Sequence, residues 1–111
     1  MNVLEIDPPT GAMELVNNAG AVLLDVREDD EWSAGHAPGA IHVRLGDLDA
    51  RTFETAAPIV AVCRSGNRSG SAATKLTAAG LTVYNLVGGM GAWQRIGQPV
   101  IRDNGAPGTV I

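Results

Sequence analysis

Short apolar runs alternate along the chain with stretches whose small and apolar residues recur at helical spacing. The apolar runs predict five β-strands, at residues 3–6, 22–26, 40–43, 59–63 and 82–86. The stretches between them predict five helices, at residues 11–18, 29–34, 45–50, 67–79 and 89–96. This alternation is typical of an α/β fold, in which helices cover both faces of a parallel sheet.

The length of 111 residues fits one domain with one hydrophobic core. Residues 103–108, with the sequence D-N-G-A-P-G, follow the last predicted helix and predict a loose tail. We therefore expect a single domain over residues 1–102 and a C-terminal tail over residues 103–111.

Composition narrows the class of protein. Hydrophobic residues make up 45% of the chain and charged residues 18%, which favours a globular protein over a disordered one. The net charge of -4 at pH 7 argues against general binding to nucleic acid or to anionic membranes. No apolar stretch approaches the roughly 20 residues of a membrane span, and residues 1–15 show no secretory signal. The cytoplasm is the expected compartment, and a single cysteine, Cys63, fits its reducing conditions.

Cys63 lies where a buried strand breaks into a basic, glycine-containing loop before a helix. Ligands of open parallel sheets bind beyond the carboxyl ends of the strands, which is where this loop falls. Its backbone N–H groups, the start of the helix and the charges of Arg64 and Arg68 would all favour a thiolate, so the pKa of Cys63 should lie below that of a free thiol. The alternative is an inert core cysteine. In that case the charges of two arginines would lose hydration beside the thiol and gain no interaction in exchange, which argues against an inert cysteine.

Four separated motifs carry a resemblance to a known family. They are L-L-D-V-R-E-D-D-E-W at residues 23–32, G-H-A-P-G-A-I-H-V at 35–43, C-R-S-G-N-R-S at 63–69 and G-G-M-G-A-W at 88–93. In type, order and spacing they resemble the rhodanese-like sulfurtransferases, from about residue 20 to about residue 99. The resemblance implies a rhodanese-like α/β fold, with a central parallel five-stranded sheet and helices on both faces.

The resemblance also implies a reaction. The thiolate of Cys63 would take the outer sulfur of a small anionic donor such as thiosulfate, form a persulfide, and pass the sulfur to cyanide or a thiol, including a thiol of a partner protein. No cofactor and no metal ion are expected. The residues implied in substrate binding are Arg64, Ser65, Gly66, Asn67 and Arg68, with Arg68 assigned to the donor; the supporting residues are Ser69, Asp25, Arg27 and Trp93.

Other polar and aromatic residues of the motifs are expected to be structural. Asp25 and Arg27, with Glu28 and Glu31 close behind, are interpreted as a network that pins neighbouring loops, in which Arg27 also adds positive charge to the site.

The two histidines, His36 and His42, are expected to form structural hydrogen bonds, because two histidines six residues apart make a poor zinc site. Trp32 and Trp93 are expected in packing, and Trp93 together with residues 88–90 is a candidate wall of the active-site mouth.

Two other functions remain open. Cysteine phosphatases and arsenate reductases have five residues between the cysteine and the arginine of their loop, whereas four residues separate Cys63 from Arg68. Phosphatase or arsenate reductase activity is therefore a weaker alternative than sulfur transfer. A rhodanese-fold module that only binds partners or carries sulfur is the other, although the intact Cys63, Arg64 and Arg68 argue against it. Arg44 stands where the family commonly has proline, and an exposed arginine there could recruit an acidic partner.

Overall fold

A five-stranded parallel sheet forms the centre of the protein. The structure is a computed structural model that describes residues 3–51, 53, 55 and 57–111. Its strands are β1 (Leu4–Ile6), β2 (Val22–Asp25), β3 (Ile41–His42), β4 (Ile59–Val62) and β5 (Val83–Leu86). Their order is β1-β5-β4-β2-β3, and all neighbouring pairs are parallel. Each strand lies within its predicted range, and the α/β fold class is confirmed.

The observed helices match their predicted ranges less closely than the strands do. They are η1 (Pro9–Asn18), α1 (Asp29–Ala34), η2 (Leu45–Asp47), α2 (Asn67–Ala78) and α3 (Gly89–Arg95). The first, η1, is a π-helix and begins two residues before the predicted range; at its end the amide of Ala19 donates to the carbonyl oxygen of Glu14, five residues back. In the described parts of the chain, no helix has the length and apolarity to cross a membrane.

The predicted helix at residues 45–50 is wrong in extent, because only a single 3-10 turn forms there. The amide of Leu48 closes this turn by donating to the carbonyl oxygen of Leu45. Leu48 itself is extended, with φ -71° and ψ 119°, and its side chain is buried in the core that α2 covers. Burial of Leu48 from an extended backbone ends the helix after one turn.

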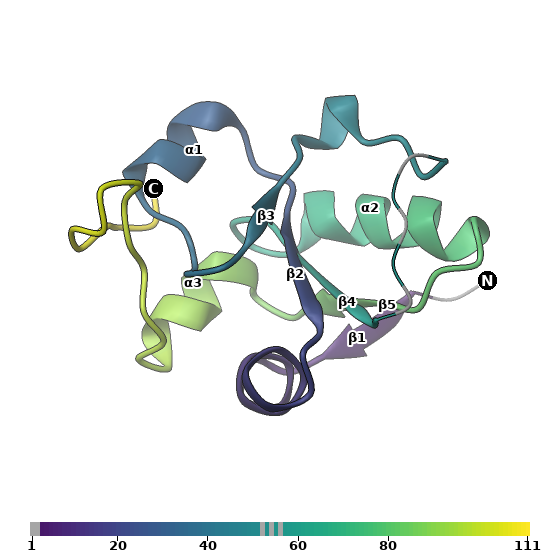
Figure 1. Ribbon diagram of the computed structural model, residues 1–111, viewed down its shortest axis with the longest axis horizontal. Helices are drawn as coiled ribbons and strands as arrows, with labels where there is room; N and C mark the ends of the chain where they lie inside the picture. Colours follow the sequence, from purple (N-terminus) through teal and green to yellow (C-terminus); the bar gives the residue numbers. More distant parts are fainter. Residues whose placement is uncertain (1–2, 52, 54, 56) are drawn as a thin grey trace.

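Helices cover both faces of the sheet, with α2 on one side and η1 and α3 on the other (Figure 1). Alternate residues of the central strand enter the two cores, as the period of a β-strand requires. Ile59, Ala61 and Cys63 lie in the core beneath α2. Val60 and Val62 lie in the opposite core with Trp93. Because all four residues of β4 are buried, its continuous apolar run is explained.

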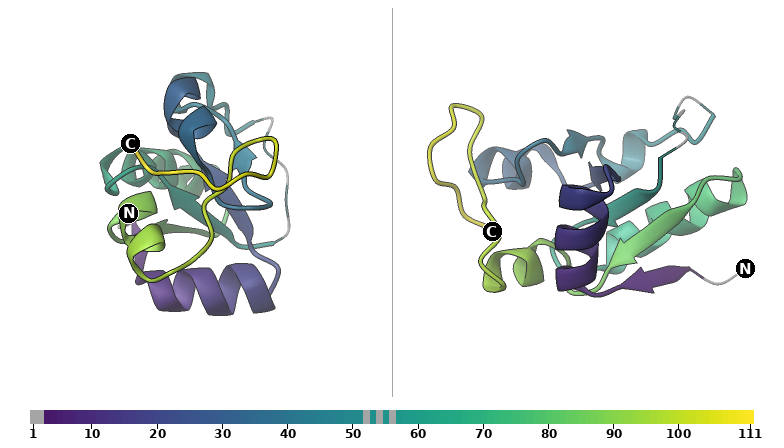
Figure 2. Two further views of the ribbon diagram at one scale, coloured as in Figure 1. Left: turned by 90° about the vertical axis from the view of Figure 1, so that its left-hand side faces the viewer. Right: turned by 60° about the horizontal axis from the view of Figure 1, so that its bottom comes forward.

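The C-terminal segment folds back onto the domain, so the expectation of a loose tail at residues 103–108 is wrong (Figure 2). Ile101 exchanges two hydrogen bonds of 2.8 Å with His36, and the amide of Thr109 donates to the carbonyl oxygen of Ala34 over 3.0 Å. A Cβ atom on Gly108 would lie 2.7 Å from the Cα atom of Gly35, so the segment packs closely against the end of α1. The turn residues form a hairpin turn here; the boundary at residue 102 stays a prediction.

A buried ion pair holds α1 against the end of β2. Asp25 and Arg27 are both fully buried, and their closest charged atoms, Oδ2 and Nη2, lie 2.8 Å apart. The Arg27 guanidinium also donates to the carbonyl oxygens of Gly35, over 2.8 Å, and of Glu31, over 3.3 Å. These contacts are the ones expected of a network that pins neighbouring loops.

Replacing Asp25 should unfold the protein at markedly lower denaturant. The substitution Asp25→Ala leaves the Arg27 charge buried without its carboxylate, and we expect a loss of about 3 to 5 kcal/mol in the free energy of unfolding, measured by urea titration. The exposed Asp30 of α1 offers a matched control, and Asp30→Ala should change that free energy by about 0.5 kcal/mol or less. Equal losses in the two variants would contradict the pinning role.

Candidate active site

The sulfur of Cys63 sits inside the loop that joins β4 to α2. Cys63 is buried, with 1% of its surface exposed. The amide of Gly66 donates a hydrogen bond to Sγ over 3.0 Å, and the hydroxyl of Ser69 lies 3.3 Å from the same atom. Gly66 has φ +115°, a backbone conformation that glycine adopts without strain and that directs its amide at the sulfur. The loop therefore places hydrogen-bond donors around a buried thiol.

These donors decide the ionisation of Cys63. Burial raises the pKa of the thiol, but hydrogen bonds from the Ser69 hydroxyl and from the amides of Ser69, Gly66 and Ser65 outweigh it, so the pKa lies below its ordinary value. This direction agrees with the one that the sequence predicts. The amides of the loop lower the pKa, as the sequence predicts, and the Ser69 hydroxyl joins them; the arginine charges, which the sequence also indicated, are not among the main causes.

The guanidinium of Arg68 is already paired within the chain. Its Nη1 and Nη2 atoms donate to Oε1 and Oε2 of Glu31 over 2.6 Å and 2.8 Å. The hydrogen bond to Glu31 raises the pKa of Arg68, and the same bond lowers the pKa of Glu31. Glu31 is held in turn by the amide of Glu28, over 3.1 Å. An ion pair between residues 37 apart thus joins α1 to the start of α2. Glu31 accepts from two of the five N–H groups of the Arg68 guanidinium, and the Nε edge is among those that it leaves unused.

Two other cations, Arg64 and Arg27, are bound to partners other than the sulfur. Arg64 is exposed, and its Nε atom donates to the main-chain oxygen of Ile111 over 2.9 Å. Arg27 is paired with Asp25 over 2.8 Å, and its charge still helps to lower the pKa of Glu31. The expected addition of its positive charge to the sulfur site stays a prediction. Asp25 and Arg27 act on the site through α1, because Arg27 holds the main chain of Glu31.

The first turn of α3 fixes the backbone of the cysteine loop. The amide of Met90 donates to the carbonyl oxygen of Cys63 over 2.7 Å, and the amide of Gly91 donates to that of Arg64 over 3.0 Å. Gly89 has φ +57°, and a Cβ atom there would overlap the carbonyl oxygen of Cys63 and lie 2.8 Å from that of Arg64. A glycine at position 89 is what allows α3 to approach this closely.

Trp93 is a core residue. It is 2% exposed, and its indole N–H donates to the carbonyl oxygen of Pro99 over 2.9 Å. The expected packing role is confirmed. Trp93 lines neither of the two cavities beside the loop, so it is not a wall of either; Gly88 lines both.

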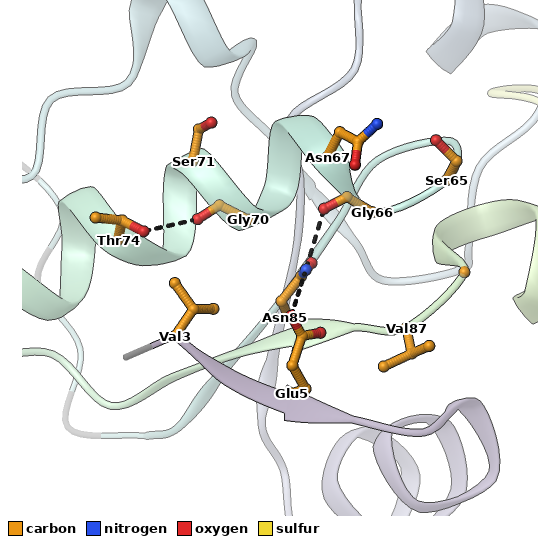
Figure 3. Close-up of a pocket in the computed structure, with 11 residues that line it drawn as sticks. Val3, Glu5, Ser65, Gly66, Asn67, Gly70, Ser71, Thr74, Asn85 and Val87 are labelled. Carbon is orange, nitrogen blue, oxygen red and sulfur yellow. Dashed lines mark hydrogen bonds between the residues drawn. The ribbon is translucent and has the colours of Figure 1, made fainter. Parts of the chain in front are cut away.

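The two cavities lie on either side of Ser65 and Gly88. One, of about 490 Å³, is bordered by polar groups that include Glu5, Asn67 and Asn85 (Figure 3). The other, of about 320 Å³, is bordered by the guanidinium groups of Arg64 and Arg95. Ser65 lines both cavities and Asn67 lines the first, whereas Cys63 lines neither.

Asn85 is a residue of the site that the sequence analysis missed. It lies on β5, is 5% exposed, and its Oδ1 atom is 2.6 Å from the Ser69 hydroxyl. A signal was present, because Asn85 is the one amide in the strand V-Y-N-L and shares the inward-facing alternation of Val83. A buried amide in an apolar strand needs hydrogen-bond partners.

The histidines have structural partners, as predicted. His36 Nδ1 is 2.9 Å from the carbonyl oxygen of Trp32, and His42 Nε2 is 2.7 Å from that of Arg27. Both imidazoles stack on the indole of Trp32, with centroids 3.7 Å and 4.6 Å away.

No group of three or more His, Cys, Asp or Glu side chains that could hold a metal ion is found among the residues that the structure describes. Arg44, expected to be open to an acidic partner, pairs within the chain with Asp47 over 2.6 Å and Asp29 over 3.5 Å.

Comparison with known proteins agrees with this geometry. The family model of the rhodanese-like domain matches residues 9–96. The chain belongs to this family. It is 34% identical over 96 residues to the putative sulfurtransferase YtwF of Bacillus subtilis, with 85% of this chain and 93% of that protein covered. It is 38% identical over 97 residues to the thiosulfate sulfurtransferase GlpE of Pseudomonas putida, with coverages of 78% and 82%.

The fold of this rhodanese-like domain is also found among solved structures. A rhodanese-related protein from Thermoplasma volcanium matches with a TM-score of 0.77 and 29% identity, over 88% of this chain and 97% of that one. The predicted family and rhodanese-like fold are confirmed.

The close approach of α3 gives a test with an internal control. Gly89→Ala should lower the free energy of unfolding by about 2 to 5 kcal/mol, because it combines a strained φ with overlap on the Cys63 carbonyl. Gly97 has φ +84°, and no atom lies within 4 Å of the place that a Cβ atom would take there, so Gly97→Ala should cost only the strain, about 1 to 2 kcal/mol. Urea unfolding of both variants measures the difference, and an equal cost would show that space at Gly89 is unimportant.

Proposed function

We propose that this rhodanese-like domain is a sulfurtransferase that moves a sulfane sulfur from thiosulfate or a related donor to a thiophilic acceptor through a persulfide on Cys63. The observation that carries the proposal is the cradle of donors at the sulfur, namely the Gly66 amide at 3.0 Å and the Ser69 hydroxyl at 3.3 Å. They hold the pKa of Cys63 below its ordinary value in spite of burial. The names of the curated relatives support the same class of reaction.

In the first half-reaction the thiolate of Cys63 attacks the outer sulfur of thiosulfate. A sulfur–sulfur bond forms to Cys63 while the sulfur–sulfur bond of the donor breaks, and its electron pair leaves with sulfite. The persulfide keeps one negative charge on its outer sulfur. We assign the stabilisation of that charge to the backbone amides of residues 64–68, and the contact with the anionic donor to the Nε edge of Arg68.

In the second half-reaction a thiol or cyanide attacks the outer sulfur, and Cys63 leaves as the thiolate. The donors from Gly66 and Ser69 stabilise this leaving group, because they lower the pKa of Cys63. Neither half-reaction calls for a cofactor. A thiol acceptor, free or on a partner protein, fits the reducing cytoplasm that the sequence predicts.

Mass spectrometry tests the persulfide directly. After treatment with thiosulfate, the intact protein should gain the mass of one sulfur atom, mapped to Cys63, because this is the single thiol in the chain. Cys63→Ser should remain folded, gain no sulfur and form no thiocyanate from thiosulfate and cyanide. Thiocyanate formation by the folded serine variant at the parent rate would rule out the mechanism.

Arg68 should matter in turnover. Arg68→Ala removes one charge-assisted hydrogen bond to the donor, and we expect kcat/KM for thiosulfate to fall by about tenfold to a hundredfold. Arg68→Lys should restore part of the loss, since it keeps the charge but not the planar fork. Because the pair with Glu31 is partly exposed, the alanine variant should lose about 1 kcal/mol of stability or less.

The control for Arg68 is Arg51→Ala, which removes an equal charge from an exposed pair with Asp49. This variant should turn over thiosulfate like the parent. If Arg68→Ala also does so, Arg68 has no part in donor binding.

A further inference from the structure

The hydroxyl of Ser69 has one proton and three acceptors within reach. Its Oγ atom lies 2.6 Å from Oδ1 of Asn85, 3.3 Å from Sγ of Cys63 and 3.3 Å from the carbonyl oxygen of Gly66. One O–H group makes one strong hydrogen bond at a time. By distance, the preferred acceptor is the Asn85 amide oxygen, not the sulfur.

The orientation of the Asn85 amide leaves Ser69 little alternative. Its Nδ2 atom donates to the carbonyl oxygen of Gly66 over 3.0 Å and lies 3.5 Å from Oε1 of Glu5, as Figure 3 shows. A flipped amide would turn its oxygen toward these two acceptors, so the network fixes Nδ2 there and Oδ1 toward Ser69. Asn85 therefore faces the Ser69 hydroxyl as an acceptor only.

We propose that Asn85 is a positioning residue that competes with the sulfur of Cys63 for the single hydroxyl proton of Ser69. While Cys63 is a thiol, the hydroxyl donates to Asn85 and its oxygen can accept from the S–H group. When the thiol loses its proton to solvent, the hydroxyl turns to the thiolate, and its bond to Asn85 is broken. Asn85 thereby sets how strongly Ser69 can stabilise the thiolate.

The acceptor of the Ser69 hydroxyl also changes when the sulfur of Cys63 becomes a persulfide. This part of the inference rests on the proposed function. In a persulfide the negative charge lies on the outer sulfur and Sγ is neutral, so the Ser69 hydroxyl returns to Asn85. No atom or electron pair passes to Asn85, which only accepts and releases a hydrogen bond. Asn85 thus stabilises the thiol and the persulfide relative to the free thiolate.

A neutral substitution at Asn85 leaves the charges around Cys63 unchanged. The charged residues nearest the loop are Arg64, Arg68, Glu28, Glu31, the pair Asp25 and Arg27, Glu5 and Arg95. Asp29 and Asp30 on α1 and Lys75 on α2 are the other charged residues of the same helices. A change in the ionisation of Cys63 in an uncharged Asn85 variant therefore reports on hydrogen bonding.

The test is the rate of Cys63 alkylation by iodoacetamide as a function of pH. Asn85→Ala frees the Ser69 hydroxyl for the thiolate, so the midpoint of the profile should move to lower pH. At a pH below the parent midpoint, the thiolate fraction should rise by about three- to tenfold. Ser69→Ala removes the donor, so its midpoint should move to higher pH. In the double variant the Asn85 substitution should have no further effect, because it acts only through Ser69.

Asn85→Asp is a control for a general disturbance of the loop by any substitution at position 85. It keeps an acceptor beside Ser69 and adds a negative charge, so its midpoint should move to higher pH, opposite to the alanine variant. The proposal is overturned if folded Asn85→Ala leaves the midpoint unchanged or raises it, or if its shift persists without the Ser69 hydroxyl. Should the alanine variant fail to fold, the uncharged Asn85→Leu, which also lacks an acceptor, takes its place: a lower midpoint supports the proposal, and an unchanged or higher one overturns it.

A second measurement separates this inference from the proposed function. In a fixed mixture of thiosulfate and sulfite, at a pH above both midpoints where the unmodified protein is thiolate, Asn85→Ala should hold about three- to tenfold less persulfide relative to unmodified protein than the parent, by intact mass. An equal or greater ratio contradicts the persulfide part of the inference. Alkylation needs only the thiol and does not depend on persulfide formation. If the alkylation midpoints shift as predicted but the parent protein forms no persulfide, the role of Asn85 is upheld and the proposed function is rejected.

Discussion

Two backbone hydrogen bonds from α3 determine what the cysteine loop can do. The amides of Met90 and Gly91 bind the carbonyl oxygens of Cys63 and Arg64, so these oxygens point at α3 and not at the sulfur. The amide of Gly66 is then free to face Sγ. Without such donors, burial alone would raise the pKa of Cys63. The lowered pKa of this buried thiol thus depends on a helix that holds the cysteine loop through main-chain hydrogen bonds.

Local sequence patterns predict the buried strands and the place of the cysteine loop. A continuous apolar run indicates a strand buried on both faces, and β4 is such a strand. The loop after it had to lie at the carboxyl edge of the sheet, which explains why the direction of the Cys63 pKa could be predicted. Contacts between Arg68 and Glu31, or between Ser69 and Asn85, could not be predicted in the same way. They join distant segments, and they depend on the strand order β1-β5-β4-β2-β3, which alternation of elements does not specify.

Two errors show the limits of local patterns in different ways. Residues 45–50 have a helical pattern, but Leu48 enters the core beneath α2 from an extended backbone, and this tertiary contact overrides local preference. The residues D-N-G-A-P-G indicate a turn, and a turn does form, closed by a hydrogen bond of 2.8 Å from Arg102 to Ala106. The error was to equate turn residues with freedom of movement, since the hairpin packs closely on Gly35.

The strand order has a consequence for the order of events while the chain is made. Leu4 pairs with Tyr84, so β1 must wait for most of the chain before it finds its neighbour. The loop of Cys63 also forms late, because Met90 and Gly91, whose amides anchor it, both follow it along the chain. Until those residues leave the ribosome, the nascent cysteine lacks the anchored loop, and it has the reactivity of an ordinary thiol. Assembly of the sheet and activation of the sulfur therefore finish together.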